Sequence, residues 1–201
     1  MDNRSRPYSC GPLVRLALTV SSAAVLLAGC GPSGPSRTVE NYFPLAVGNQ
    51  WCLARTNPRD TAVIELTDSL ILEGLTYYKS PDPGDTNTVH WYVHRNGELR
   101  MYSTRIDSTP EDTGSYLLLL REPFDKDSTW PSPNDPRETL RVIDRDFTLN
   151  VPAGTFEHCV EVEANIASTY FYAPGVGLAE LGPLPDTSYI INYLLLSYVI
   201  K

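Results

Sequence analysis

The chain is poor in the residues on which most catalytic sites depend. Its 201 residues include three histidines, four cysteines and two methionines, and it contains no Gly-x-Ser-x-Gly, His-Glu-x-x-His or Cys-x-x-Cys motif. His90 and His94 would share a strand face about 13 Å apart, which is too far for both to ligate one metal ion. The sequence therefore predicts no catalytic residues, no metal site and no cofactor.

Positive charge is also scarce. Lysine and arginine number 16 against 24 aspartates and glutamates, so the net charge is -8 at pH 7. Because nucleic-acid binding requires a basic face that meets the phosphates, this composition excludes nucleic acid as a partner. The acidic segments 82–87 and 107–112 offer oxygen ligands of the type that calcium accepts, but turn formation accounts for the same residues.

The N-terminal apolar run, residues 16–27, is too short to cross a membrane as a helix, which requires roughly 20 residues. It follows Arg4, Arg6 and Arg15. A charged start that leads into a short apolar run is the layout of a secretory signal.

This segment ends in Leu27-Ala28-Gly29-Cys30, which resembles the lipobox of bacterial lipoproteins. The match predicts cleavage before Cys30 and attachment of lipid to its sulfur. The acyl chains then anchor the protein to a membrane, since each buried methylene contributes about 0.8 kcal/mol. Because Gly31 rather than an aspartate follows, the resemblance implies the outer membrane if the cell is Gram-negative.

The sequence divides into a predicted signal peptide (1–29), a lipidated flexible tether (30–37) and a single β domain (38–201). Cleavage leaves 172 residues with 13 basic and 23 acidic side chains, hence a net charge of -10. A chain of this length suits one domain with a sizeable core.

Two cysteines remain for the exported domain once Cys10 is removed and Cys30 is lipidated. Strict strand alternation places Cys52 and Cys159 on polar faces, where unpaired thiols are a liability in an oxidising compartment, so we predict a disulfide between them. The alternative is two separate small residues. The same alternation turns His158 toward the apolar side of its strand, as a hydrogen-bonded core residue.

Short runs with strand character, broken by turn residues, predict an all-β domain. The clearest element is a hairpin of 88–95 and 98–103 joined by Asn96-Gly97, the dipeptide that favours a type I′ turn. Only 138–147 competes as a helix, through apolar residues at helical spacing. The predicted fold is an antiparallel sheet that forms a curved half-barrel, barrel or sandwich with little helix. The other strands are expected at 50–56, 61–71, 75–79, 115–121, 138–149, 155–165, 168–173, 176–181 and 188–200.

Two segments echo each other: 44–51 and 123–130 each begin with proline and end with tryptophan seven positions later. The echo indicates either two related β-units or a chance agreement of two residue types.

Three ordered motifs span most of the domain. They are Tyr42-Phe43-Pro44-Leu45 with Gly48 and Trp51, Val151-Pro152-Ala153-Gly154-Thr155-Phe156 with Cys159, and Tyr172-Ala173-Pro174-Gly175-Val176-Gly177-Leu178. Together they resemble a family of small uncharacterised bacterial lipoproteins, and the resemblance implies an antiparallel β fold without a known activity. The chain departs from the family at Asp127, where the second proline-to-tryptophan segment would carry a glycine.

Two predicted strands, 116–120 and 189–200, are apolar on both faces, so other apolar atoms must cover each side. If these strands pack only on protein, the domain is a scaffold that meets envelope proteins, which is the role we predict. The second alternative is a carrier of an apolar small molecule or lipid, with a cavity of about 300 Å³ or more lined by Leu118, Leu120, Leu194 and Leu196. The third alternative is a hydrolase.

Overall fold

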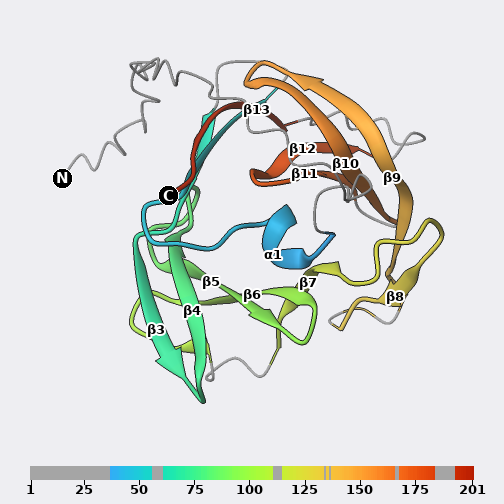
Figure 1. Cartoon of the computed structure of the whole chain (residues 1–201). Coiled ribbons are helices and arrows are strands. Elements are labelled where there is room, and N and C mark those ends of the chain that lie inside the picture. The colour runs from blue at the N-terminus through green and yellow to red at the C-terminus, as the bar shows by residue number, and fades with distance from the viewer. Residues whose placement is uncertain are drawn as a thin grey trace, which may run out of the picture.

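The chain forms an all-β fold of two antiparallel sheets, as the sequence predicts (Figure 1). The structure is a computed structural model, and it describes residues 37–55, 61–110, 115–133, 135, 137–165, 168–183 and 193–201. Of the arrangements that the sequence leaves open, the one observed is two separate sheets that face a common core.

The larger sheet has eight strands, whose order across the sheet is β2 (Thr61–Glu65), β1 (Gln50–Arg55), β13 (Tyr193–Val199), β12 (Gly177–Pro183), β11 (Ser168–Ala173), β10 (Gly154–Ala164), β9 (Thr139–Val151) and β8 (Thr129–Pro131). The smaller sheet has five strands in the order β3 (Asp68–Leu72), β4 (Leu75–Pro81), β5 (Thr88–Arg95), β6 (Glu98–Arg105) and β7 (Leu117–Arg121). One helical turn, α1 (Val39–Tyr42), precedes β1.

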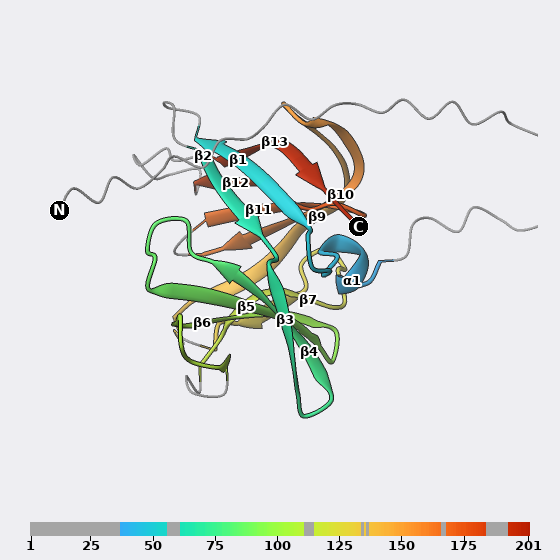
Figure 2. The same ribbon diagram turned by 90° about the vertical axis from the view of Figure 1, so that its left-hand side faces the viewer.

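The inner faces of the two sheets share one apolar core. The larger sheet curves around α1, which lies between it and the smaller sheet, and the β3–β4 hairpin extends beyond the rest of the molecule (Figures 1 and 2). Burying one large apolar side chain contributes roughly 1.5–3 kcal/mol relative to leaving it exposed. The fully buried side chains come from α1 and from both sheets, and include Tyr42, Trp51, Leu99, Leu120, Val160, Tyr172 and Leu195.

The predicted β5–β6 hairpin is confirmed. Asn96 and Gly97 have φ angles of 54° and 72°, as a type I′ turn requires. Arg95 therefore pairs with Glu98, and the register continues without a bulge to the pair of Thr88 and Arg105.

The segment 61–71 is two strands rather than the single strand predicted. The chain leaves the larger sheet after Glu65 and joins the smaller sheet at Asp68. Leu66, at this corner, is fully buried and donates its N–H to the carbonyl of Asn49 at 2.9 Å. Burial of Leu66 thus fixes the point at which the chain changes sheets.

The competing helix at 138–147 does not form, because these residues belong to the long strand β9. Leu140 and Val142 are buried, and the residues between and after them are more exposed. This alternation matches the inner and outer faces of the larger sheet, so tertiary burial decides between the two periods.

The echoed segments 44–51 and 123–130 form turns of the same construction. Gly48 and Asp127 have φ angles of 91° and 67°. Each donates its N–H to a later segment of the chain, Gly48 to the carbonyl of Leu66 just after β2 and Asp127 to that of Val142 in β9. The echo in the sequence therefore corresponds to a repeated local structure, and Asp127 takes the conformation that glycine favours.

β5 carries buried side chains on both faces, which the sequence did not indicate. Tyr92 contributes to the main core, whereas Val89, Trp91 and Val93 form a second apolar cluster on the other face of the smaller sheet. β7 and β13, which were predicted to be covered on both sides, each carry fully buried residues on one face, with partly exposed residues between them.

Candidate functional site

An open concavity of about 460 Å³ lies beside the start of β10. Thr155, Phe156, Glu157 and Pro174 line it, and it is called the motif concavity below because these residues come from two of the three sequence motifs. Phe156 contacts Tyr198 of β13 edge to face, with ring centroids 5.9 Å apart. An aromatic ring and a proline thus face solvent beside a carboxylate.

The first sequence motif meets the other two at this concavity. The hydroxyl of Tyr42 donates to the carbonyl of His158 at 2.7 Å, next to the lining residue Glu157. The N–H of Gly175, next to Pro174, donates to the carbonyl of Asn41 at 2.6 Å. Hydrogen bonds between distant segments therefore hold two sides of the concavity.

A buried contact between Trp51 and the third motif completes this arrangement. The indole Nε1–H of Trp51 donates to the carbonyl of Val176 at 2.6 Å. Gly177 has a φ of 117°, and a Cβ at this position would lie 2.8 Å from Trp51 Nε1. The glycine is required both for its backbone conformation and for the close approach of the indole.

His158 lies at the edge of the concavity, and its predicted place in the core is wrong. The register of β10 against β9 shifts between Phe156 and Cys159, and His158 has a φ of 58°. This bulge turns the imidazole outward, where its side chain is 47% exposed and its Nδ1 lies 2.5 Å from Asp146 Oδ1. The hydrogen bond with His158 lowers the pKa of Asp146, and Arg37 contacts the same carboxylate at 3.6 Å.

The predicted disulfide between Cys52 and Cys159 is not formed. Cys159 is a free, fully buried thiol whose Sγ donates to the carbonyl of Phe156 at 3.4 Å, so it does not pair with Cys52. The predicted polar faces are also wrong, because both cysteines are buried. At Cys159 the physical reason is the bulge at His158, which breaks the strict alternation on which the prediction relied.

The four leucines predicted to line a ligand cavity do not come together. Leu118 and Leu120 in β7 are buried in the main core, whereas Leu194 and Leu196 in β13 are partly exposed. The core position in β13 belongs to Leu195, which pairs with Leu53 of β1. A run that is apolar at every position carries no alternation from which its inner face can be read.

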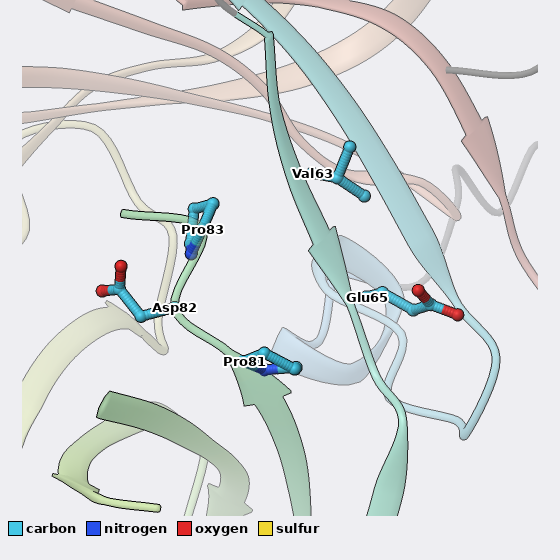
Figure 3. A pocket seen from close by; sticks show the side chains of 5 residues that line it. All are labelled: Val63, Glu65, Pro81, Asp82 and Pro83. Carbon is cyan, nitrogen blue, oxygen red and sulfur yellow. The ribbon is translucent and has the colours of Figure 1, made fainter. Parts of the chain in front are cut away.

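A second, much smaller cavity of about 30 Å³ lies at the seam between the two sheets. Val63 and Glu65 of β2 stand on one side, and Pro81 and Pro83 on the other (Figure 3). Its volume is of the order that one water molecule occupies. Asp82 also lines this cavity, but its carboxylate points away from β2 (Figure 3).

The carboxylate of Asp82 begins a chain of polar side chains. Its Oδ2 lies 2.8 Å from His90 Nε2, and His90 Nδ1 lies 3.0 Å from Ser103 Oγ. Oδ1 of Asp82 accepts the N–H groups of Gly84 at 2.6 Å and Asp85 at 2.9 Å. Partial burial acts to raise the pKa of Asp82, but the hydrogen bonds from Gly84, His90 and Asp85 outweigh it, so the pKa is lowered.

Sequence reasoning missed this chain, although one signal for it was present. The type I′ turn at Asn96-Gly97 fixes the register of the hairpin, and that register makes His90 and Ser103 cross-strand neighbours. The place of Asp82 carried no such signal. In the structure the carboxylates of Asp82 and Asp85 both accept hydrogen bonds from their own loop, which agrees with the turn-forming interpretation of this acidic segment.

The described part of the chain contains no group of three or more His, Cys, Asp or Glu side chains that could hold a metal ion. Among the same residues, no helix is long and apolar enough to cross a membrane.

Comparison with known proteins gives two distant likenesses. No protein-family model and no curated protein matches the chain. It is similar to a proposed lipoprotein from Parabacteroides distasonis at 14% identity, with a TM-score of 0.44 over 82% of this chain and 100% of that one. It is also similar to a proposed exported protein with a YmcC-like fold from Bacteroides fragilis at 12% identity, with a TM-score of 0.45 over 79% of this chain and 99% of that one.

Proposed function

We propose that this protein is a lipoprotein of the bacterial cell envelope, anchored through lipid on Cys30, that binds a protein partner at the motif concavity. In a Gram-negative cell the anchoring membrane is the outer one, as Gly31 after the lipidated cysteine favours. The role is that of a scaffold: the anchor holds the domain at the membrane, and the concavity holds the partner.

The observation that carries this proposal is that two of the sequence motifs line one open concavity and the first motif hydrogen-bonds to both of them beside it. A left-handed backbone at a histidine is an uncommon conformation that costs free energy, and such strain gathers at functional sites. Here it places the half-exposed side chain of His158 at the edge of the concavity. The apolar surface of Phe156 and Pro174, with polar groups around it, has the mixed character of a protein-binding patch.

The chemistry of the concavity favours binding over catalysis. Its neighbouring thiol, Cys159, is turned into the core, and burial raises the pKa of that thiol to about 11. A thiol that stays protonated and enclosed is a poor nucleophile. The carrier alternative has less support, because Leu118 and Leu120 pack against protein in the main core.

The position of the concavity suits a membrane-proximal partner. Arg37, the first described residue, contacts Asp146, which bonds to His158 at the edge of the concavity. Arg37 lies seven positions after Cys30, and extended chain spans at most about 3.3–3.6 Å per residue. On the lipoprotein proposal, the concavity therefore stays within roughly 25 Å of the membrane surface.

Site-specific photocrosslinking in cells tests the proposal. A photoreactive amino acid at Glu157 of the full-length chain is expected to form one discrete protein adduct, whereas the same group at exposed Ser69 of β3, in the other sheet, gives none. Thr155→Arg places a bulky charge in the concavity without touching the core, and we expect it to abolish the adduct. Equal adducts at both positions, or an adduct that survives Thr155→Arg, would contradict a binding role for this surface.

A further inference from the structure

The chain of Asp82, His90 and Ser103 lies in the smaller sheet and its β4–β5 loop, and the partner-binding proposal makes no use of it. We propose that these residues form a hydrolytic site in which Ser103 is the nucleophile, His90 the general base and Asp82 the residue that positions the imidazole. The substrates are uncharged carboxylic esters. This hydrolytic activity is separate from the proposed binding function and does not depend on it.

The hydrogen bonds assign the tautomer of His90. An ionised carboxylate can only accept, so Nε2 of the neutral imidazole carries the proton that is shared with Asp82 Oδ2 at 2.8 Å. Nδ1 is then an acceptor, and the hydroxyl of Ser103, 3.0 Å away, donates to it. An unprotonated ring nitrogen that already accepts the hydroxyl proton is the arrangement required to activate a serine.

Each member of the chain is held differently, in a way that suits its role. Asp82 is fixed because its other oxygen accepts two backbone N–H groups. The side chain of His90 is 17% exposed, so it is sheltered between its two partners. Ser103 is exposed on β6, so a substrate reaches the nucleophile from solvent.

Arg105 supplies positive charge beside the nucleophile. It follows Ser103 by two positions in β6, where the pairing with β5 has no bulge, so the two side chains share a face with Cα atoms about 7 Å apart. Its charge already acts on Asp85 in the neighbouring loop. A guanidinium at this place can stabilise the negative oxygen that develops when an ester carbonyl is attacked.

The reaction has two steps, acylation of Ser103 and hydrolysis of the acyl-serine, and it consumes one water molecule. Ser103 Oγ bonds to the ester carbonyl carbon while its proton passes to His90 Nδ1, and the C–O bond to the alcohol then breaks as the alcohol takes that proton. Water then attacks the carbonyl carbon of the acyl-serine and gives one proton to the same nitrogen. The bond between that carbon and Ser103 Oγ breaks as Oγ takes the proton, which releases the carboxylic acid and regenerates the serine hydroxyl. The carboxylate of Asp82, which bonds to His90, and that of Asp85 in the same loop disfavour an anionic acyl group.

The test uses a fluorophosphonate probe and p-nitrophenyl acetate with the full-length protein in a non-denaturing detergent. Wild-type protein is expected to take up the probe on Ser103, as mapped by peptide mass spectrometry, and to hydrolyse the ester. Ser103→Ala loses both properties, while Ser69→Ala, which changes an exposed strand serine in the same sheet, keeps them. Folding of each variant is checked by circular dichroism and by its thermal unfolding midpoint.

Two further variants separate a catalytic chain from a merely structural one. His90→Gln is expected to lower the ester-hydrolysis rate about 10²–10⁴-fold. Asp82→Asn keeps an oxygen for the Gly84 and Asp85 N–H groups but reverses the tautomer of His90, so we expect a similar loss of about 10²–10⁴-fold in kcat together with a changed pH profile. Absence of the probe from Ser103 in folded wild-type protein would overturn the inference, as would ester hydrolysis unchanged in Asp82→Asn.

Discussion

Gly48 and Asp127, 79 positions apart, have the same left-handed backbone in two turns with matching hydrogen bonds. In both turns the next residue donates its N–H three positions back, Asn49 to the carbonyl of Ala46 and Ser128 to that of Asp125. Each turn leads into a strand with a buried tryptophan, Trp51 in β1 and Trp130 in β8. The same turn conformation therefore precedes a strand in each half of the larger sheet.

This equivalence predicts opposite effects for two substitutions. Asp127→Gly relieves a φ of 67° and is expected to stabilise the domain by about 0.5–1 kcal/mol. The exposed contact of Asp127 with Arg141 at 3.8 Å is lost, but such surface pairs contribute little. Gly48→Ala is expected to cost about 1–2 kcal/mol. Urea unfolding measures both, and a destabilised Asp127→Gly would contradict the equivalence of the turns.

Gly177→Ala tests the contact that joins the first and third motifs. Its Cβ would lie 2.8 Å from Trp51 Nε1 at a φ of 117°, so we expect a loss of more than about 2 kcal/mol, with a shift in tryptophan fluorescence. Gly175→Ala is the matched control, because its φ is 71° but no atom lies within 4 Å of the added Cβ. It should cost about 1 kcal/mol, and equal losses for the two variants would show that the indole contact is unimportant.

Cys159 is expected to resist alkylation in the native protein. Its thiol is fully buried, and burial raises its pKa to about 11, so iodoacetamide at pH 8 should label it only after unfolding in guanidinium. Peptide mapping without reductant reads the labelled site. A peptide that joins Cys52 to Cys159 would restore the disulfide that the structure lacks.

Glu161 is expected to destabilise the domain at neutral pH. Burial raises its pKa, as do the charges of Asp144, Glu163 and Glu180. A carboxyl group whose pKa is raised on folding favours the native state at low pH, and this contribution is lost as the pH rises through the raised pKa. Glu161→Gln should therefore stabilise by about 0.5 kcal/mol at pH 7 and show no advantage below about pH 4.

The exposed Glu157, four positions earlier in β10, provides the matched control for Glu161. Glu157→Gln should change the free energy of unfolding by less than about 0.5 kcal/mol at either pH. If Glu161→Gln has the same effect at pH 7 and pH 4, repulsion among the outer-face carboxylates is not the cause.

Cys30→Ser is expected to leave an uncleaved precursor that incorporates no labelled fatty acid, because lipidation of the sulfur precedes cleavage. Metabolic labelling followed by mass spectrometry of the N-terminus provides the measurement, and Cys10→Ser is the control, since this cysteine lies within the removed segment. Normal processing of Cys30→Ser would end the lipoprotein proposal without affecting the hydrolytic one.

Residues whose conformation is set by their neighbours in the chain were predictable. Asn96-Gly97 specified the β5–β6 register, and proline and glycine turns marked most strand limits. His158 and Cys159 were placed wrongly, because the register of β10 against β9 shifts between Phe156 and Cys159. Val160 and Val162, further along the strand, are buried as alternation predicts. The motif concavity could not be predicted from the sequence, because it is held by hydrogen bonds between segments more than 100 residues apart.

The sequence by itself determined the antiparallel β class and the register of the central hairpin, because turn chemistry and alternation act over a few residues. The lipobox at Cys30 is likewise a local signal, and it remains a prediction. Only the tertiary structure decided that the chain changes sheets at Leu66, that Leu195 rather than Leu194 or Leu196 faces the core, and that Asp82 reaches His90. Each of these depends on packing between distant segments. The free energy of that packing comes from many contacts together, so no single position of the sequence predicts it.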